Sequence, residues 1–146
     1  VPGIKLRTTL MTGFPGEKDV HFKAMKKFIE EKEFDRLGVF RYSGEEGTPA
    51  YGMQGQVSEK VKRNREKTLM ELQKNISRKK LKKLRGTVME ILVEGKKGTY
   101  FTGRTEFDAP DIDGTVYIKT KKQLKAGDFC MVKITSSNDY DLFASY

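Results

Sequence analysis

The first 55 residues alternate between apolar and amphipathic segments in the order strand, helix, strand. Residues 4–12 are rich in β-branched and apolar side chains and run into the turn residues 13–16, which predicts a strand that ends in a tight turn. A helix should follow, with Glu17 near its positively polarised start and Asp19 as its N-cap. Apolar residues recur in this helix at the expected spacing, at Val20, Ala24, Phe28 and Ile29.

A second, mostly apolar strand is predicted at residues 37–42, before a loop at residues 43–55 that is rich in Gly and contains Pro. A strand, a crossover helix and a second strand form a β-α-β unit with parallel strands. Parallel sheets are normally covered on both faces and contain more than two strands. Two possibilities follow: residues 1–55 supply only the edge of a sheet, or the remaining strands lie in a part of the protein that is absent from this sequence.

The next segment, residues 58–84, has the period of one long helix. Its basic side chains, Lys62 and Arg65 among them, are expected to lie mostly off the apolar stripe and to face solvent. The stripe consists of Val57, Val61, Leu69, Leu72, Ile76 and Leu84. Two roles remain open for this helix, a solvated linker or a surface that contacts RNA phosphates.

The rest of the chain contains five short segments of strand composition separated by turn residues, at residues 87–93, 99–107, 115–119, 128–135 and 141–144. This spacing predicts a small all-β, OB-like antiparallel barrel. Its core is expected to contain Val88, Ile91, Val93, Val116, Ile118, Val132 and Ile134. The chain should thus consist of an α/β part at residues 1–55, a connecting helix at residues 56–85 and a barrel at residues 86–146.

The formal charge of +9 belongs to the connecting segment alone. Residues 56–86 contain twelve Lys or Arg against three Asp or Glu, whereas residues 1–55 carry +1 and residues 87–146 carry −1. No apolar run approaches the roughly 18 to 20 residues of a spanning helix, so we expect no membrane contact.

A single cysteine, Cys130, and a single histidine, His21, limit the metal chemistry. Zinc sites and iron–sulfur clusters need three or four such ligands, so this chain is expected to hold no metal by itself. We expect Cys130 to be a buried strand residue and His21 a surface helix residue. One cysteine cannot form an internal disulfide, and residues 1–3 do not start a signal peptide, which predicts a cytoplasmic protein, and a piece of a longer one.

Several stretches match known motifs. Residues 9–17, Thr-Leu-Met-Thr-Gly-Phe-Pro-Gly-Glu, with residues 34–43 and 45–50, resemble the late barrel strands of radical S-adenosylmethionine methylthiotransferases, and the C-terminal sixty residues resemble their TRAM domain. Residues 107–114, Phe-Asp-Ala-Pro-Asp-Ile-Asp-Gly, with residues 103–105, resemble the RimO branch of that family. That branch methylthiolates an aspartate of ribosomal protein S-twelve.

The resemblance implies that residues 1–55 are the last strands and helices of a TIM-like radical S-adenosylmethionine barrel. It also implies S-adenosylmethionine and two [4Fe–4S] clusters as cofactors of the full-length enzyme. The family binds its clusters with three cysteines of an N-terminal domain and with a Cys-x-x-x-Cys-x-x-Cys loop, and neither is present in these residues. We therefore expect a C-terminal part of the enzyme that is inactive and holds no cofactor alone.

The resemblance also supplies candidate site residues, none of them catalytic. Met11 and Gly13 are the candidate cofactor-binding residues, because a strand at this place lies beside the adenine in such folds. The alternative is that Met11 belongs to the barrel core and that Gly13 serves only the turn.

The candidate substrate-docking residues are Asp108, Asp111, Asp113 and Arg104. An acidic surface suits a basic ribosomal protein, and the spacing of these aspartates is not that of a calcium loop. Two rival functions remain open. One is an RNA-binding module that uses the basic helix and the barrel aromatics, and the other is a tRNA methylthiotransferase, which shares the strand, turn and barrel pattern.

Overall fold

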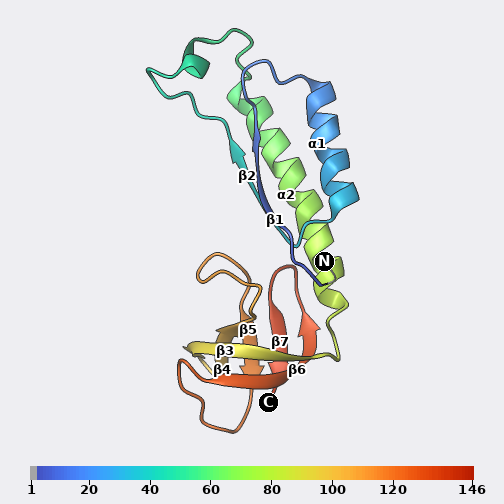
Figure 1. Ribbon diagram of the computed structural model, residues 1–146, viewed down its shortest axis with the longest axis vertical. Helices are drawn as coiled ribbons and strands as arrows, with labels where there is room; N and C mark the ends of the chain where they lie inside the picture. Colours follow the sequence, from blue (N-terminus) through green and yellow to red (C-terminus); the bar gives the residue numbers. More distant parts are fainter. Residues whose placement is uncertain (1–2) are drawn as a thin grey trace. The chain divides into compact units, whose positions relative to one another are not determined.

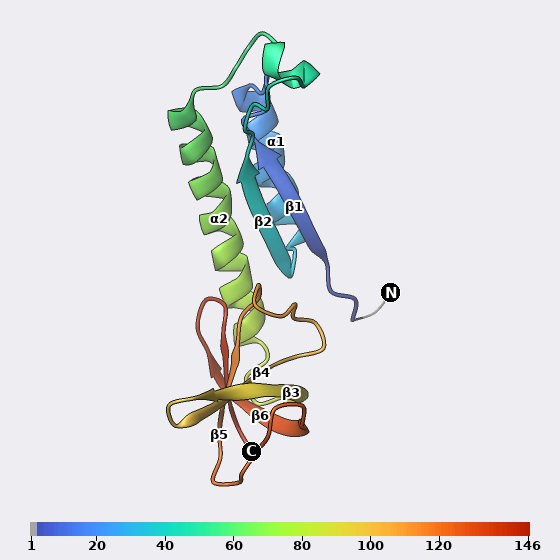
Figure 2. The same cartoon turned by 90° about the vertical axis from the view of Figure 1, so that its left-hand side faces the viewer.

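The structure, a computed structural model, describes residues 3–146. Val1 and Pro2, which belong to the α/β part predicted at residues 1–55, lie outside the described residues. The chain divides into two compact units, Val1–Ile76 and Ser77–Tyr146 (Figure 1, Figure 2). Each unit has its own apolar core, and residues of the predicted connecting helix contribute to both cores.

The first unit contains the predicted β-α-β arrangement. Strand β1 (Arg7–Thr12) pairs in parallel with β2 (Arg36–Arg41), and helix α1 (Asp19–Lys32) connects them. A short 3₁₀ helix, η1 (Pro49–Gly52), lies in the loop before helix α2 (Glu59–Lys82). Two parallel strands and no further member of their sheet occur within residues 3–146, so the larger radical S-adenosylmethionine barrel is not seen in this part of the chain.

Both helices pack on one face of this small sheet. The shared core contains Ile29 of α1, Leu69 and Ile76 of α2, and Leu37 and Val39 of β2. The described residues leave the opposite face uncovered. Met11 and Phe40 are paired in register on it and are 53% and 61% exposed.

The predicted N-cap of α1 is wrong by one residue. Asp19 is the first helical residue, and Lys18 occupies the N-cap position. The ring of His21, rather than a carboxylate, accepts the backbone N–H of Lys18 at its Nδ1 atom, over 3.1 Å. Asp19 instead accepts a hydrogen bond from Arg65, and His21 is exposed as predicted.

The expectation that the basic residues of α2 lie mostly off its buried face holds for most of them and is wrong for two. Lys62 and Arg65 are buried, whereas Val61 of the predicted stripe is exposed. The buried face of α2 is therefore apolar at Leu69 and Ile76 and cationic nearer the start of the helix. These cations find anionic and carbonyl partners at the strand ends, which apolar side chains could not use.

The second unit contains a closed barrel of five strands near the predicted positions. These are β3 (Val88–Lys97), β4 (Tyr100–Arg104), β5 (Val116–Lys119), β6 (Phe129–Ser137) and β7 (Leu142–Ser145), closed in the order β3-β4-β5-β7-β6. The expectation of a purely antiparallel barrel is wrong, because β5 and β7 pair in parallel. Strand direction cannot alternate around a ring with an odd number of strands, so a closed barrel of five must contain a parallel pair.

Residues that alternate along the barrel strands fill its interior, among them Ile91, Val93, Ile118, Val132 and Ile134. Val88 does not, because it is an odd number of residues from Ile91 and Val93 and so points outward, 58% exposed. Cys130 is buried in this core, as predicted. No helix within residues 3–146 is long and apolar enough to cross a membrane.

Candidate functional site

Buried polar groups gather where β1 ends, and Glu17 is at their centre. Its carboxylate accepts hydrogen bonds from the Oγ1 atom of Thr12 and from the backbone N–H of Gly13, both over 2.9 Å. The guanidinium of Arg65 donates to the same carboxylate over 2.6 Å, and both side chains are 8% exposed. A second branch of Arg65 reaches Asp19 over 2.7 Å. The turn after β1 is thus held by one buried ion pair and its hydrogen bonds.

The end of β2 is held in a similar way by Lys62. Its Nζ atom donates to the backbone carbonyl of Tyr42 over 2.9 Å and pairs with Glu59 over 2.9 Å. The hydrocarbon stem of Lys62 lies against Gly13, so a Cβ atom at that position would collide with it. Gly13 also has a φ of +80°, which side chains rarely adopt. Lys62 therefore contacts the ends of both strands.

The structure separates the two candidate cofactor residues by environment. Met11 is exposed on the open face beside Phe40, near the carboxyl end of β1. Gly13 is buried, and the stem of Lys62 accounts for the absence of a side chain there. Met11 and Phe40 offer an apolar surface at the strand ends, where α/β sheets commonly bind ligands.

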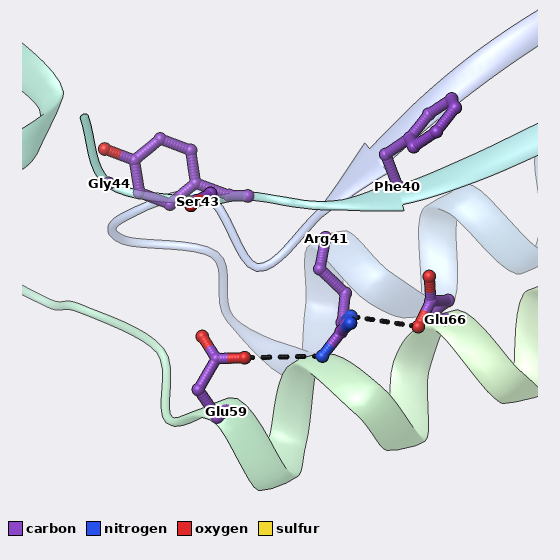
Figure 3. A pocket seen from close by; sticks show the side chains of 7 residues that line it. Phe40, Arg41, Ser43, Gly44, Glu59 and Glu66 are labelled. Carbon is purple, nitrogen blue, oxygen red and sulfur yellow. Dashed lines mark hydrogen bonds and ion pairs between the residues drawn. The ribbon is translucent and has the colours of Figure 1, made fainter.

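A pocket of about 340 Å³ opens where β2 ends (Figure 3). Its lining contains Phe40, Arg41, Tyr42, Ser43, Gly44, Glu59 and Glu66. Figure 3 shows Arg41 directed toward α2 while Phe40 projects to the other side of the strand. Arg41 pairs with Glu66 over 3.0 Å and with Glu59 over 3.5 Å.

Two polar groups of this pocket, the carboxyl of Glu59 and the hydroxyl of Tyr42, are in unusual environments. The hydrogen bond from Lys62 lowers the pKa of Glu59, and the nearby charges of Arg41 and Arg63 add to the effect. The hydroxyl of Tyr42 is buried and has no hydrogen-bond partner among the described residues. The pocket walls carry more negative than positive charge, because Glu59 and Glu66 face one arginine.

The three predicted docking aspartates lie in the loop between β4 and β5, and Arg104 is the last residue of β4. Most of these four residues shape the loop. Asp108 is 6% exposed and accepts hydrogen bonds from the backbone N–H and the Oγ1 atom of Thr105, over 3.3 and 2.6 Å. Asp113 accepts the backbone N–H of Ala109 over 2.6 Å. Arg104 donates to Glu94 of β3 over 2.7 Å and to the carbonyl of Asp108 over 3.2 Å.

A second acidic segment, residues 139–141, is also tied to the barrel. Asp141 accepts the backbone N–H of Thr115 over 2.9 Å, and Asp139 pairs with Arg78 over 2.6 Å. Among the five aspartates of the two segments, Asp111 alone is exposed, and it adopts a φ of 59° at the loop surface. Its neighbour Ile112 is 77% exposed. Sequence composition could not separate the loop-forming aspartates from the one at the surface.

No group of three or more His, Cys, Asp or Glu side chains suited to a metal ion occurs in residues 3–146. Burial raises the pKa of the Cys130 thiol, which keeps it protonated and unreactive. Sequence reasoning missed Glu17, Lys62 and Arg65 as members of the strand-end network. The available signal was that Lys62 and Arg65 share a helical face with Leu69 and Ile76.

Comparison with known proteins confirms the resemblance drawn from the motifs. Residues 86–146 match the family model of the TRAM domain. The whole chain is 47% identical over 146 residues to a protein of Thermoanaerobacter sp. (strain X514) named "Ribosomal protein uS12 methylthiotransferase RimO", of which it covers 34%. A protein of the same name from Clostridium kluyveri is 54% identical over 139 residues, which is 95% of this chain and 31% of the relative. The chain therefore spans about a third of the length of the curated relatives that it matches.

Proposed function

We propose that this chain is the C-terminal part of a RimO-type methylthiotransferase, which transfers a methylthio group to an aspartate of ribosomal protein uS12. The observation that carries the proposal is the identity to relatives named uS12 methylthiotransferase along the whole chain. Those names favour the protein substrate over a tRNA base. Such an enzyme would act in the cytoplasm, where ribosomal proteins are made and assembled.

In this proposal the first unit is the end of a larger parallel barrel. Its support is the parallel β1–β2 pair with one face covered by helices and the other open, since parallel sheets are normally covered on both faces. The remaining barrel strands, and the cysteines that bind two [4Fe–4S] clusters, would belong to residues outside this chain.

The open face fits S-adenosylmethionine. Met11 and Phe40 present an apolar surface on which an adenine ring can lie, and Gly13 is the first residue after the strand that carries Met11. When bound, S-adenosylmethionine supplies a sulfonium group that accepts an electron from a cluster. The role of this chain is to orient the cofactor through Met11 and the backbone at Gly13, with no catalytic side chain of its own.

The barrel is proposed to dock uS12 through the loop between β4 and β5. Ribosomal proteins are usually basic, and residues 87–146 carry a net charge of −1. Asp111 and Ile112 make the contact, because they are the exposed residues of the Asp-Ile-Asp run. Asp108, Asp113 and Arg104 serve docking indirectly, by holding the loop in shape.

The experiment is a transfer assay with the complete enzyme, its clusters reconstituted, and S-adenosylmethionine labelled on its methyl group. Purified uS12 and bulk tRNA are offered together. The proposal expects label in uS12, at an aspartate found by peptide mass spectrometry. Label in tRNA alone would establish the tRNA-modifying alternative, and label in neither would overturn the proposed function.

A second candidate function, RNA contact by α2, is favoured by one further observation. Lys60, Arg63 and Lys67 are exposed on the side of α2 opposite the buried Lys62 and Arg65. Such a row of cations can neutralise phosphates and release counterions, so binding would weaken steeply with salt. RNA affinity that Lys60→Glu with Arg63→Glu leaves unchanged would exclude this role.

A further inference from the structure

The buried face of α2 changes its chemistry along the first unit. Leu69 and Ile76 lie in the apolar core, but one and two turns earlier the same face carries Arg65 and Lys62, also buried. Burying a cation is costly unless the cation is paired and hydrogen-bonded, and apolar side chains of similar volume often serve packing as well or better. Packing alone therefore does not account for cations at these two positions.

Arg65 acts on the end of β1 through Glu17. One oxygen of the Glu17 carboxylate accepts hydrogen bonds from Thr12 and Arg65, and the other accepts one from the backbone N–H of Gly13. Arg65 also donates to the backbone carbonyl of Glu17 over 3.3 Å. The carboxylate is thus anchored from α2 while it holds the backbone of the turn.

Lys62 acts on the end of β2 and on the same turn. Its ammonium holds the carbonyl of Tyr42, the first residue after β2, and its stem packs against Gly13. The ring of Tyr42 in turn lies edge-on to Phe14, with centroids 5.2 Å apart. The ends of both strands are therefore held by side chains of one helix, α2, which follows them in the chain.

We propose that Arg65 and Lys62 are positioning residues of the cofactor site at the ends of β1 and β2. This inference rests on the proposed function, because it takes Met11 and Gly13 as the part of the chain that faces S-adenosylmethionine. Arg65 and Lys62 touch that surface only through Glu17, Gly13 and Tyr42. Their loss lets the turn after β1 adopt other conformations, and the cofactor must then bind the fraction that remains in the productive one.

The test measures S-adenosylmethionine affinity and thermal stability of the complete enzyme with its clusters reconstituted. Equilibrium dialysis with radiolabelled cofactor gives the Kd without reference to turnover. Arg65→Met and Lys62→Met are each expected to weaken binding about tenfold, the effect of losing a charge-assisted hydrogen bond that orders the site. Lys67→Met, on the exposed side of the same helix, is the matched control and should stay within about twofold.

A double variant, Glu17→Met with Arg65→Met, separates positioning from folding. Replacing a buried ion pair by apolar residues often leaves stability intact, so we expect a Tm near that of the parent. Affinity should remain about tenfold weakened, because Gly13 and Thr12 have lost their acceptor. If the Tm and the Kd of the double variant both equal those of the parent, the ion pair serves structure only and the inference is overturned.

The remaining outcomes separate this inference from the proposed function. If the parent enzyme binds the cofactor and all these variants bind it equally well, the positioning role is overturned and the proposed function stands. If the parent enzyme with intact clusters does not bind S-adenosylmethionine, both are overturned.

Discussion

Replacing Asp108 tests whether the acidic loop is held from inside. The carboxylate of Asp108 is buried and accepts two hydrogen bonds from Thr105, which is itself buried. Asp108→Ala would leave the backbone N–H and the hydroxyl of Thr105 without this acceptor. The loop should therefore lose its shape before any partner is involved.

The size of the effect follows from those two bonds. A buried polar group left unsatisfied costs about 1–3 kcal/mol, and a hydrogen bond to a charged group contributes about 1.5–3 kcal/mol. We expect Asp108→Ala to lower the free energy of unfolding of the barrel by about 2–3 kcal/mol. Asp111→Ala, at the loop surface, should change it by less than about 0.5 kcal/mol.

The assay is urea unfolding of the chain, followed by tyrosine fluorescence and by amide hydrogen exchange in β3 to β7. Exchange assigns the transition to the barrel, because the chain forms two units and need not unfold in one step. Equal stability of the Asp108 and Asp111 variants would refute the reasoning, since it would mean that the bonds to Thr105 contribute nothing net.

Three further changes test other parts of the account. Gly13→Ala should destabilise the first unit by about 2 kcal/mol, because its φ of +80° is unfavourable for alanine and its Cβ would displace Lys62, as urea unfolding would show. Since burial raises the pKa of Cys130, iodoacetamide should label this thiol far more slowly than free cysteine at pH 8, and equal rates would contradict its burial. Because the pKa of Cys130 is raised by folding, its thiol contributes stability that is fully present below the pKa of the unfolded thiol. This contribution to the free energy of unfolding declines as the pH rises toward the pKa of the folded thiol, and Cys130→Ala should remove the decline. Glu59→Leu should leave the Tyr42 carbonyl as the one hydrogen-bond partner of the Lys62 ammonium among the described residues, and a weaker protection of the Tyr42 amide from exchange would check it.

The elements were predictable because their hydrophobic periods are simple. The β-α-β order and the five barrel strands lie within a few residues of the predicted positions. The misplaced N-cap at Asp19 and the misplaced core residue Val88 have local causes. The imidazole of His21 accepts the backbone N–H at the start of α1, and the carboxylate of Asp19 binds Arg65 instead. Val88 is an odd number of residues from Ile91 and Val93, so its side chain points out of the barrel.

The strand-end network was not predictable from hydropathy, because hydropathy counts Lys62 and Arg65 as solvent-facing residues. Their burial depends on Glu17 and on the Tyr42 carbonyl, which are distant in the sequence and meet only in the folded unit. The acidic loop shows the same limit. Asp108 and Asp111 are alike in composition, yet one binds its own loop and the other is exposed.

The most direct test of the account measures how tightly the complete enzyme binds uS12, with variants confined to the loop between β4 and β5. Asp111→Lys and Ile112→Ala should each weaken binding about tenfold, one through charge reversal against a basic partner and the other through loss of an exposed apolar contact. Glu90→Lys, the same charge reversal at an exposed residue of β3, is the control and should bind like the parent. Binding of uS12 that neither loop variant weakens, or that Glu90→Lys weakens equally, would contradict the docking of uS12 at this loop.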